Sequence, residues 1–324
     1  ELHYPGTRGL AYPKGGMGSV IEALVKAVEK HGGVIRTGVR VEEVLLKGRR
    51  AVGVRCASRA GSSEIRAREA VVCNASIWDS ADLLPKDDPL LDEMKADWQD
   101  TPMTRSYLHL HLGIDATGLD LSKLEPHYTA MASWDDVTAE QNMVAISNPA
   151  LLDPSLCPPG KLVLHLYGAG NEPFDIWADA QAESRSAYDA LKKERAGRLW
   201  QALEEIIPDV RARVEVSLVG SPLTHRRYLR RTAGTYGPAP VFGRFGPGKV
   251  PFRTAGDALP SRRRRPGEGD QSEDDQRGVE GLLLCGDSTF PGIGVPAAVV
   301  SGLSAAHTTL SVWEHLELLG QAGY

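Results

Sequence analysis

The sequence predicts an α/β protein in two parts, and three observations support this. Residues 12–36 read as a capped helix, a short glycine turn and the start of a strand, which is half of a parallel α/β unit. Residues 281–287 read as a buried strand, followed by a helix of small residues from Val295. Between them, residues 107–114 and 161–167 alternate apolar and polar side chains, as half-buried strands do. We therefore expect a parallel α/β region, discontinuous in sequence, and an α+β region containing an antiparallel sheet.

The first helix is indicated by its ends and by its apolar spacing. Ser19 and Glu22 form an S-x-x-E capping box, and Gly32-Gly33 supplies the stop. Apolar residues recur along one face between these signals: Val20, Ile21, Leu24, Val25 and Val28.

Residues 38–76 predict three strands, with turns at Lys47-Gly48 and Gly61-Ser62. The last apolar run, residues 70–73, is typical of a strand buried on both faces. It ends at Asn74-Ala75-Ser76, where small and polar residues indicate a turn.

Residues 85–102 are charged and bracketed by prolines, so we interpret them as a boundary. Beyond it, strands at 107–114, 161–167 and 214–220, with a long amphipathic helix over 179–207, indicate a separate domain. Residues 258–280 hold four consecutive arginines, then acids, and almost no apolar residues, which predicts a disordered insert. The predicted domain limits are 1–85, 86–257, 258–280 for the insert, and 281–324.

Composition excludes several classes of protein. The 324 residues carry a net charge of −5, which does not favour nucleic-acid binding, and no apolar run approaches the ~20 residues of a membrane span. The four cysteines are widely spaced and favour a reducing compartment. The chain begins at Glu1 and shows no targeting segment, so we interpret it as part of a longer polypeptide.

Residues 292–297 match the dinucleotide fingerprint G-x-G-x-x-A, but their context differs from a true fingerprint. Six residues, 286–291, separate the strand from the glycines, and no second strand follows. Asp287 instead lies at the carboxyl end of an apolar strand, where α/β sheets bind ligands. Gly292 and Gly294 would expose backbone amides beside the positive end of the helix that Val295 opens. The loop is therefore predicted to hold an anion or the polar edge of a ring.

Three segments resemble one enzyme family. Residues 281–302 (GLLLCGDSTFPGIGVPAAVVSG) and 12–33 resemble segments of the phytoene desaturase and carotenoid isomerase family of FAD-dependent oxidoreductases. Residues 224–238 (THRRYLRRTAGTYGP) resemble the carotenoid isomerase, prolycopene isomerase-like branch. The resemblance implies a partial FAD-binding, Rossmann-like domain from 1–85 and 281–324, and a substrate domain for a polyene from 86–257. The fingerprint for the ADP half of FAD is expected in sequence that precedes this chain.

The resemblance also implies roles for particular residues. Gly286 and Asp287 match residues at the ribityl–pyrophosphate region of FAD, and the backbone of Val41 matches a contact to adenine. Further matches are the segment under the isoalloxazine (Gly292, Ile293, Gly294, Val295), a turn beside FAD (Asn74, Ala75) and a loop between the domains (Gly15, Gly16, Met17). No side chain is assigned as catalytic, because the flavin would carry the chemistry.

The function implied is cis–trans isomerisation of a carotenoid, of the poly-cis-lycopene to all-trans-lycopene type, using reduced FAD. Desaturation, or another amine-oxidase-like redox reaction, is the alternative with the same fold. A non-catalytic fragment is a third interpretation, and the chain alone is expected to be inactive. The family's location implies a chloroplast or other plastid and association with a membrane.

Two clusters of polar residues can each be interpreted either as ordinary structure or as a functional site. His109, His111 and His165 suit zinc or iron, but their two strands need not be neighbours and no carboxylate spacing supports a site. We therefore expect no metal, and a half-buried sheet face lining a cavity. The basic residues Arg226, Arg227, Arg230 and Arg231 form either a solvated face or a contact for anionic headgroups, each cation contributing about 1 kcal/mol.

Overall fold

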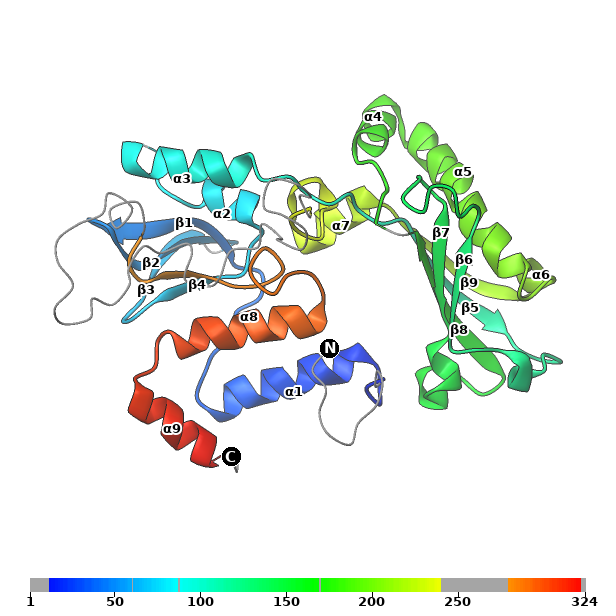
Figure 1. Ribbon diagram of the computed structural model, residues 1–324, viewed down its shortest axis with the longest axis horizontal. Helices are drawn as coiled ribbons and strands as arrows, with labels where there is room; N and C mark the ends of the chain where they lie inside the picture. The colour runs from blue at the N-terminus through cyan, green and yellow to red at the C-terminus, as the bar shows by residue number, and fades with distance from the viewer. Residues whose placement is uncertain (1–11, 60, 87, 169, 240–278, 322–324) are drawn as a thin grey trace. The chain divides into compact units, whose positions relative to one another are not determined.

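The computed structural model describes residues 12–59, 61–86, 88–168, 170–239 and 279–321 (Figure 1). The chain divides into two compact units. The first unit comprises residues 1–36 and 105–225, and the second comprises residues 37–104 and 226–324. The predicted insert at 258–280 lies outside the described residues, apart from its last two positions.

The first unit contains a five-stranded sheet in the order β6-β7-β8-β5-β9, and all its pairings are antiparallel. This confirms the antiparallel sheet predicted from alternation. Its strands are β5 (His109–Asp115), β6 (His127–Met131), β7 (Met143–Ser147), β8 (Lys161–Gly168) and β9 (Val214–Gly220).

Helices cover one face of this sheet (Figure 1). The apolar residues of β5 and β8 pack with Trp177 of α4 (Asp175–Glu183) and Leu199 of α5 (Arg185–Glu204). The single helix expected over 179–207 is therefore two helices. The break falls at Ser184, whose backbone is extended and whose Oγ accepts a hydrogen bond from the Ala187 amide.

The first unit also holds helix α1 (Met17–Lys30), which begins and ends close to its predicted limits. Its apolar face is exposed, with Ile21 at 56% and Leu24 at 53%. Helix α6 (Val210–Arg213) also belongs to the first unit, and α2 (Ile77–Asp82) belongs to the second. The limit between the two units falls within α7 (Pro222–Leu229).

The second unit contains two sheets. Strands β1 (Arg40–Lys47), β2 (Arg50–Ser58) and β3 (Gly61–Arg66) are antiparallel, whereas β4 (Val71–Cys73) and β10 (Leu282–Leu284) form a parallel pair. The third predicted strand is thus two strands. The expected burial of β4 on both faces is wrong, because Val72 is 50% exposed, while β10 is buried throughout.

The segment expected to be a boundary forms helix α3 (Pro89–Gln99) instead. Leu91 and Trp98 are fully buried in the core of the second unit, together with Trp78 of α2. Met94 packs against the same core, so the spacing of these apolar residues is helical. The helical spacing of the apolar residues decides the local structure despite the charges and the flanking prolines. Most charged side chains of α3 can lie on the face that points away from the core.

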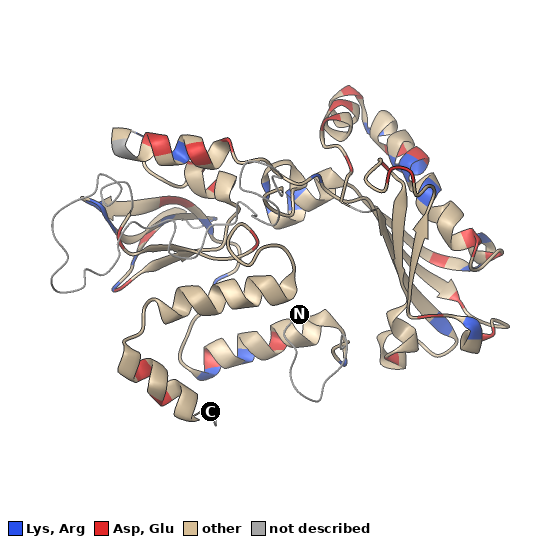
Figure 2. Ribbon diagram, in the orientation of Figure 1, with Lys and Arg blue, Asp and Glu red and all other residues tan. Residues whose placement is uncertain are grey.

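The chain continues with α8 (Val295–His307) and α9 (Val312–Gln321), two helices where the sequence had indicated one running past Trp313. Helix α8 begins at the predicted residue and carries no charged side chain apart from any charge on His307 (Figure 2). Ser301 and Ala305 on α8 are buried, whereas Val299 and Leu303 are about half exposed. Among the described helices, none has the length and apolar character needed to cross a bilayer.

Candidate flavin site and histidine cluster

The parallel pair β4–β10 places two predicted site segments side by side. The Cys285 amide donates to the Cys73 carbonyl at 3.0 Å, so both strands end at the same edge. Immediately beyond, Gly286 has φ +101°, and a Cβ at this position would lie 2.2 Å from Oδ1 of Asn74. The positive φ is what favours glycine at 286, and a side chain there would also displace the Asn74 amide group.

Side chains that the sequence did not single out fix this loop. The Gly286 amide donates to Oγ of Ser301 at 2.7 Å, and Ser301 is fully buried. Ser288 Oγ accepts a hydrogen bond from the Ile77 amide at 3.2 Å, which ties the loop to helix α2. The position of Ser301 among the small residues of α8 could be read from the sequence. Nothing in the sequence indicated that its Oγ accepts a hydrogen bond from the Gly286 amide.

Asp287 lies against Arg231, and the two side chains form an ion pair. Both are largely buried, with 14% and 19% of their side-chain surfaces exposed. Arg231 Nη1 has no aligned hydrogen-bond partner among the described residues, so the contact is electrostatic. Ser288 Oγ donates to Asp287 Oδ1 at 3.4 Å. Arg231 therefore differs from Arg226, Arg227 and Arg230, which are exposed.

The segment after Arg231 packs beside the same loop. Thr232 Oγ1 donates to Asp79 Oδ1 at 2.8 Å, which anchors this segment to α2. Gly237 has φ +140°, and a Cβ there would lie 3.1 Å from both the Asp287 carbonyl oxygen and Cγ1 of Ile293. Part of the stretch that resembles the isomerase branch thus surrounds Asp287.

The glycine loop before α8 presents bare backbone. Gly292 and Gly294 have φ of +116° and +112°, in the region that favours glycine. Nothing lies within 4 Å of a Cβ built on Gly294, and Ile293, Gly294 and Val295 are exposed. The hydrogen bond from the Ala298 amide to the Gly294 carbonyl opens the helix, so the earlier amides have no intrahelical acceptor. This open, amide-lined end fits an anionic group or the polar edge of a ring.

The other predicted site residues lie elsewhere. Val41 is on β1, opposite Cys56 in the antiparallel sheet, and is 37% exposed. Ala75 is partly exposed in the turn after β4. The loop Gly15, Gly16, Met17 belongs to the first unit, where the Gly15 amide donates to Asp153 Oδ2 at 2.7 Å. Hydrogen bonds from Ser155 and from the Gly15 amide hold the pKa of Asp153 below its usual value.

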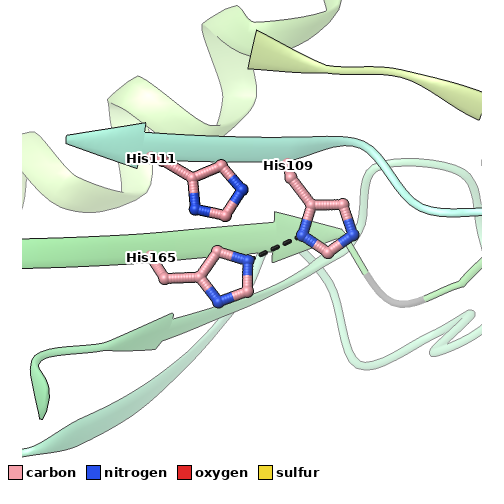
Figure 3. A group of neighbouring side chains, drawn as sticks. All are labelled: His109, His111 and His165. Atoms are coloured by element: carbon pink, nitrogen blue, oxygen red, sulfur yellow. Dashed lines mark hydrogen bonds between the residues drawn. The ribbon is translucent and has the colours of Figure 1, made fainter. Parts of the chain in front are cut away.

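The three histidines of the first unit meet on the sheet face opposite the helices (Figure 3). Strands β5 and β8 are neighbours, and His111 lies directly opposite His165. His109 Nδ1 and His165 Nε2 are 2.7 Å apart and share a hydrogen bond. Burial, with His225, His165 and His111 adding, lowers the pKa of His109 to about 2, and burial followed by His111 lowers that of His165 to about 4. Both rings are therefore neutral at pH 7.

Bare backbone at the edge of a parallel strand pair, beside a helix that opens on glycine, is an arrangement that can hold an anionic or polar group. Residues 3–310 match the model for flavin containing amine oxidoreductases, and the chain belongs to that family.

Relatives are found among enzymes that act on carotenoids. The chain is 30% identical over 308 residues to the chloroplastic prolycopene isomerase of Daucus carota, which covers 95% of this chain and 45% of that protein. It is 24% identical over 310 residues to the lycopene-forming phytoene desaturase of Pseudescherichia vulneris, covering 92% of this chain and 56% of that protein. The chain thus spans about half the length of the curated relatives it matches.

A solved structure shares the fold. An oxidoreductase from Methanosarcina mazei superposes with a TM-score of 0.53 and 19% identity, covering 91% of this chain and 55% of that one.

Proposed function

We propose that this chain is part of an FAD-dependent carotenoid cis–trans isomerase that converts a poly-cis polyene of the prolycopene type to its all-trans form. The observation that carries the proposal is the 30% identity to a prolycopene isomerase along 95% of the chain. It is supported by the packing of Gly237 and Arg231, from the isomerase-like segment, around Asp287 of the cofactor loop.

The proposed cofactor fits the residues at the strand edge. Gly286 and Asp287 would hold the ribityl–pyrophosphate region, and the backbone of residues 292–295, exposed from Ile293 onward, would meet the polar edge of the isoalloxazine. Arg231 would orient the Asp287 carboxylate, while Asn74 and Ala75 would line the turn beside the cofactor. The backbone of Val41 would contact adenine, and the loop Gly15, Gly16, Met17 would lie between the domains. When bound in reduced form, FAD would supply electron density that transiently lowers the order of a cis double bond.

The residues of this chain contribute binding and orientation. The positive end of α8 would favour negative charge at the ring edge, an effect of roughly 0.3–1 kcal/mol at an exposed helix end. Ser301 fixes the Gly286 amide, so the loop is held in position before the cofactor binds.

The test uses the natural full-length protein, supplied with poly-cis-lycopene under anaerobic, reducing conditions. Isomerisation predicts a changed chromatographic profile with unchanged mass. Desaturation, the second candidate, predicts loss of two hydrogens per step and requires an oxidant, and the similarity to a phytoene desaturase supports it. A flavin spectrum of the full-length protein and of this chain alone tests the third interpretation, a non-catalytic fragment, because such a fragment would retain no flavin.

A pair of glycine variants tests the cofactor loop. Gly294 and Gly61 both have φ +112°, and no atom lies within 4 Å of a Cβ built at either position. Leu at either position should therefore impose backbone strain of about 1–3 kcal/mol. We expect Gly294→Leu to reduce flavin retention and Gly61→Leu to leave it unchanged. Equal retention by the two variants would count against residues 292–295 as the flavin contact.

We further propose peripheral contact with an anionic membrane through Arg226, Arg227 and Arg230, since an apolar polyene would be delivered from lipid. The exposed Tyr228 and Leu229 beside them support this. Arg231 joined this set in the sequence-based prediction, but its side chain lies against Asp287. Flotation with liposomes that contain or lack anionic lipid tests the contact. A chloroplast or other plastid location is proposed from the chloroplastic relative.

A further inference from the structure

The expectation that the three histidines hold no metal had two grounds: their strands need not be neighbours, and no carboxylate spacing supports a site. The first ground is removed, because strands β5 and β8 are paired. Strand β5 supplies His109 and His111 two residues apart, so both side chains leave the same face of the sheet. Strand β8 supplies His165 directly opposite His111. One nitrogen of each ring lies within 4.8 Å of the other two.

The three rings lie close together in nearly parallel planes. His111 and His165 stack with centroids 4.4 Å apart and planes 3° apart, and His109 and His165 stack at 4.9 Å and 6° (Figure 3). His109 Nε2 is buried and has no hydrogen-bond partner among the described residues. This nitrogen is not the one that would bind an ion with His165, because His109 Nδ1 faces His165.

We propose that His109, His111 and His165 form a binding site for a divalent transition-metal ion, of which Zn²⁺ is the representative, with an open fourth position. Three imidazoles with one open position are an established zinc ligand set.

Metal binding would require the rings to turn as well as to separate, because the ring planes are nearly parallel and the lone pairs of His109 Nδ1 and His165 Nε2 are directed at each other in a hydrogen bond. Two nitrogens bound to one tetrahedral Zn²⁺ at about 2.0–2.1 Å lie about 3.3 Å apart. His109 Nδ1 and His165 Nε2, now 2.7 Å apart, would separate by about 0.6 Å. The proton that they share would move to the outer nitrogen of its own ring, so both atoms become ligands without a net loss of charge. His111 is exposed, which leaves an approach for the ion from solvent.

The first experiment measures metal uptake by the purified chain after treatment with a chelator. We expect one equivalent of Co²⁺ to bind with the visible absorption of a tetrahedral complex, and Zn²⁺ to displace it. His111→Gln and His165→Gln should each weaken Zn²⁺ binding by at least about tenfold. His127→Gln is the matched control, because His127 is an exposed strand histidine of the same sheet whose ring contacts Ser147. Binding of equal strength in His111→Gln and the wild type would overturn the proposal.

A second measurement needs no variant and is independent of variant folding. Carbethoxylation of the wild-type chain by diethyl pyrocarbonate, read by mass spectrometry, compares His111 with His127 in the presence and absence of Zn²⁺. Both histidines are exposed. Protection of His111 with no protection of His127 is expected, and equal behaviour of the two would refute the site.

Discussion

Glu172 is predicted to be a major contributor to the stability of the first unit. It is 4% exposed, and its Oε1 accepts hydrogen bonds from Trp177 Nε1 at 2.9 Å and Arg195 Nε at 2.8 Å. Its Oε2 accepts from Arg195 Nη2 at 3.0 Å. The Arg195 guanidinium is 14% exposed, so the pair is largely desolvated.

The perturbation is Glu172→Gln, which preserves the shape but removes the charge. The new amide NH₂ would face the donors of Arg195, leaving this largely buried cation with only the more exposed Glu140 as a counter-ion. Removing one partner of a buried ion pair costs about 3–5 kcal/mol, and the acceptor that Gln retains toward Trp177 places the expected loss near about 3 kcal/mol.

Glu140→Gln is a control on the same arginine. Glu140 Oε2 lies 3.3 Å from Arg195 Nη2 but is 42% exposed, so its loss should cost below about 1 kcal/mol. Urea unfolding, with hydrogen exchange of the β5 amides as a probe of the first unit, measures both variants. If Glu172→Gln destabilises β5 no more than Glu140→Gln does, the conclusion that burial makes the Glu172–Arg195 pair the stronger contributor is refuted.

Three further predictions concern the loop and the histidines. Gly286→Ala should destabilise the second unit by about 1–3 kcal/mol in urea unfolding, because φ +101° is strained for a residue with a Cβ and the Asn74 side chain would also have to move; an unchanged midpoint would contradict this. Ser301→Ala should cost about 1–3 kcal/mol by leaving the buried Gly286 amide unpaired, whereas Ser304→Ala, which alters an exposed bond to the Val300 carbonyl, should cost little. With chelator present, the free energy of unfolding should fall between pH 6.5 and 5. The pKa of His109 is 6.5 in the unfolded chain and about 2 in the folded chain, so the unfolded state binds more protons over this interval. His109 therefore contributes a loss of about 2 kcal/mol by pH 5. A urea midpoint that does not change over this interval would show that His109 is not held neutral.

Local patterns predicted much of the fold. Alternation identified β5 and β8, and the Val295-Pro296 start of α8 was visible because proline at the first helical turn is a local signal. The charged segment 85–102 was interpreted as a boundary, but it contains helix α3. Its few apolar residues have helical spacing, and this pattern was overlooked because most of the surrounding residues are charged.

Contacts between distant residues could not be predicted in the same way. Arg231 and Asp287 are 56 positions apart, and Glu172 and Arg195 are joined only because the chain returns along α5. Asp287 and Arg231 were each singled out in the sequence, and Glu172 and Arg195 were not, but neither pairing was predicted because pairing depends on topology rather than on neighbours. The facing of His111 and His165 depends likewise on the β5–β8 register, which no local pattern specifies.

That register restricts how the histidine cluster can change over evolutionary time. Leucine and histidine alternate on β5, so inserting or deleting a single residue within the strand would turn the histidines toward Trp177 and Leu199 and the leucines toward solvent. The connections between β5 and β8 that lie outside strands β6 and β7 can vary in length without this penalty, because they carry no strand register. Individual histidines can therefore be lost by substitution, but the whole set cannot be shifted along the strands by inserting or deleting one residue.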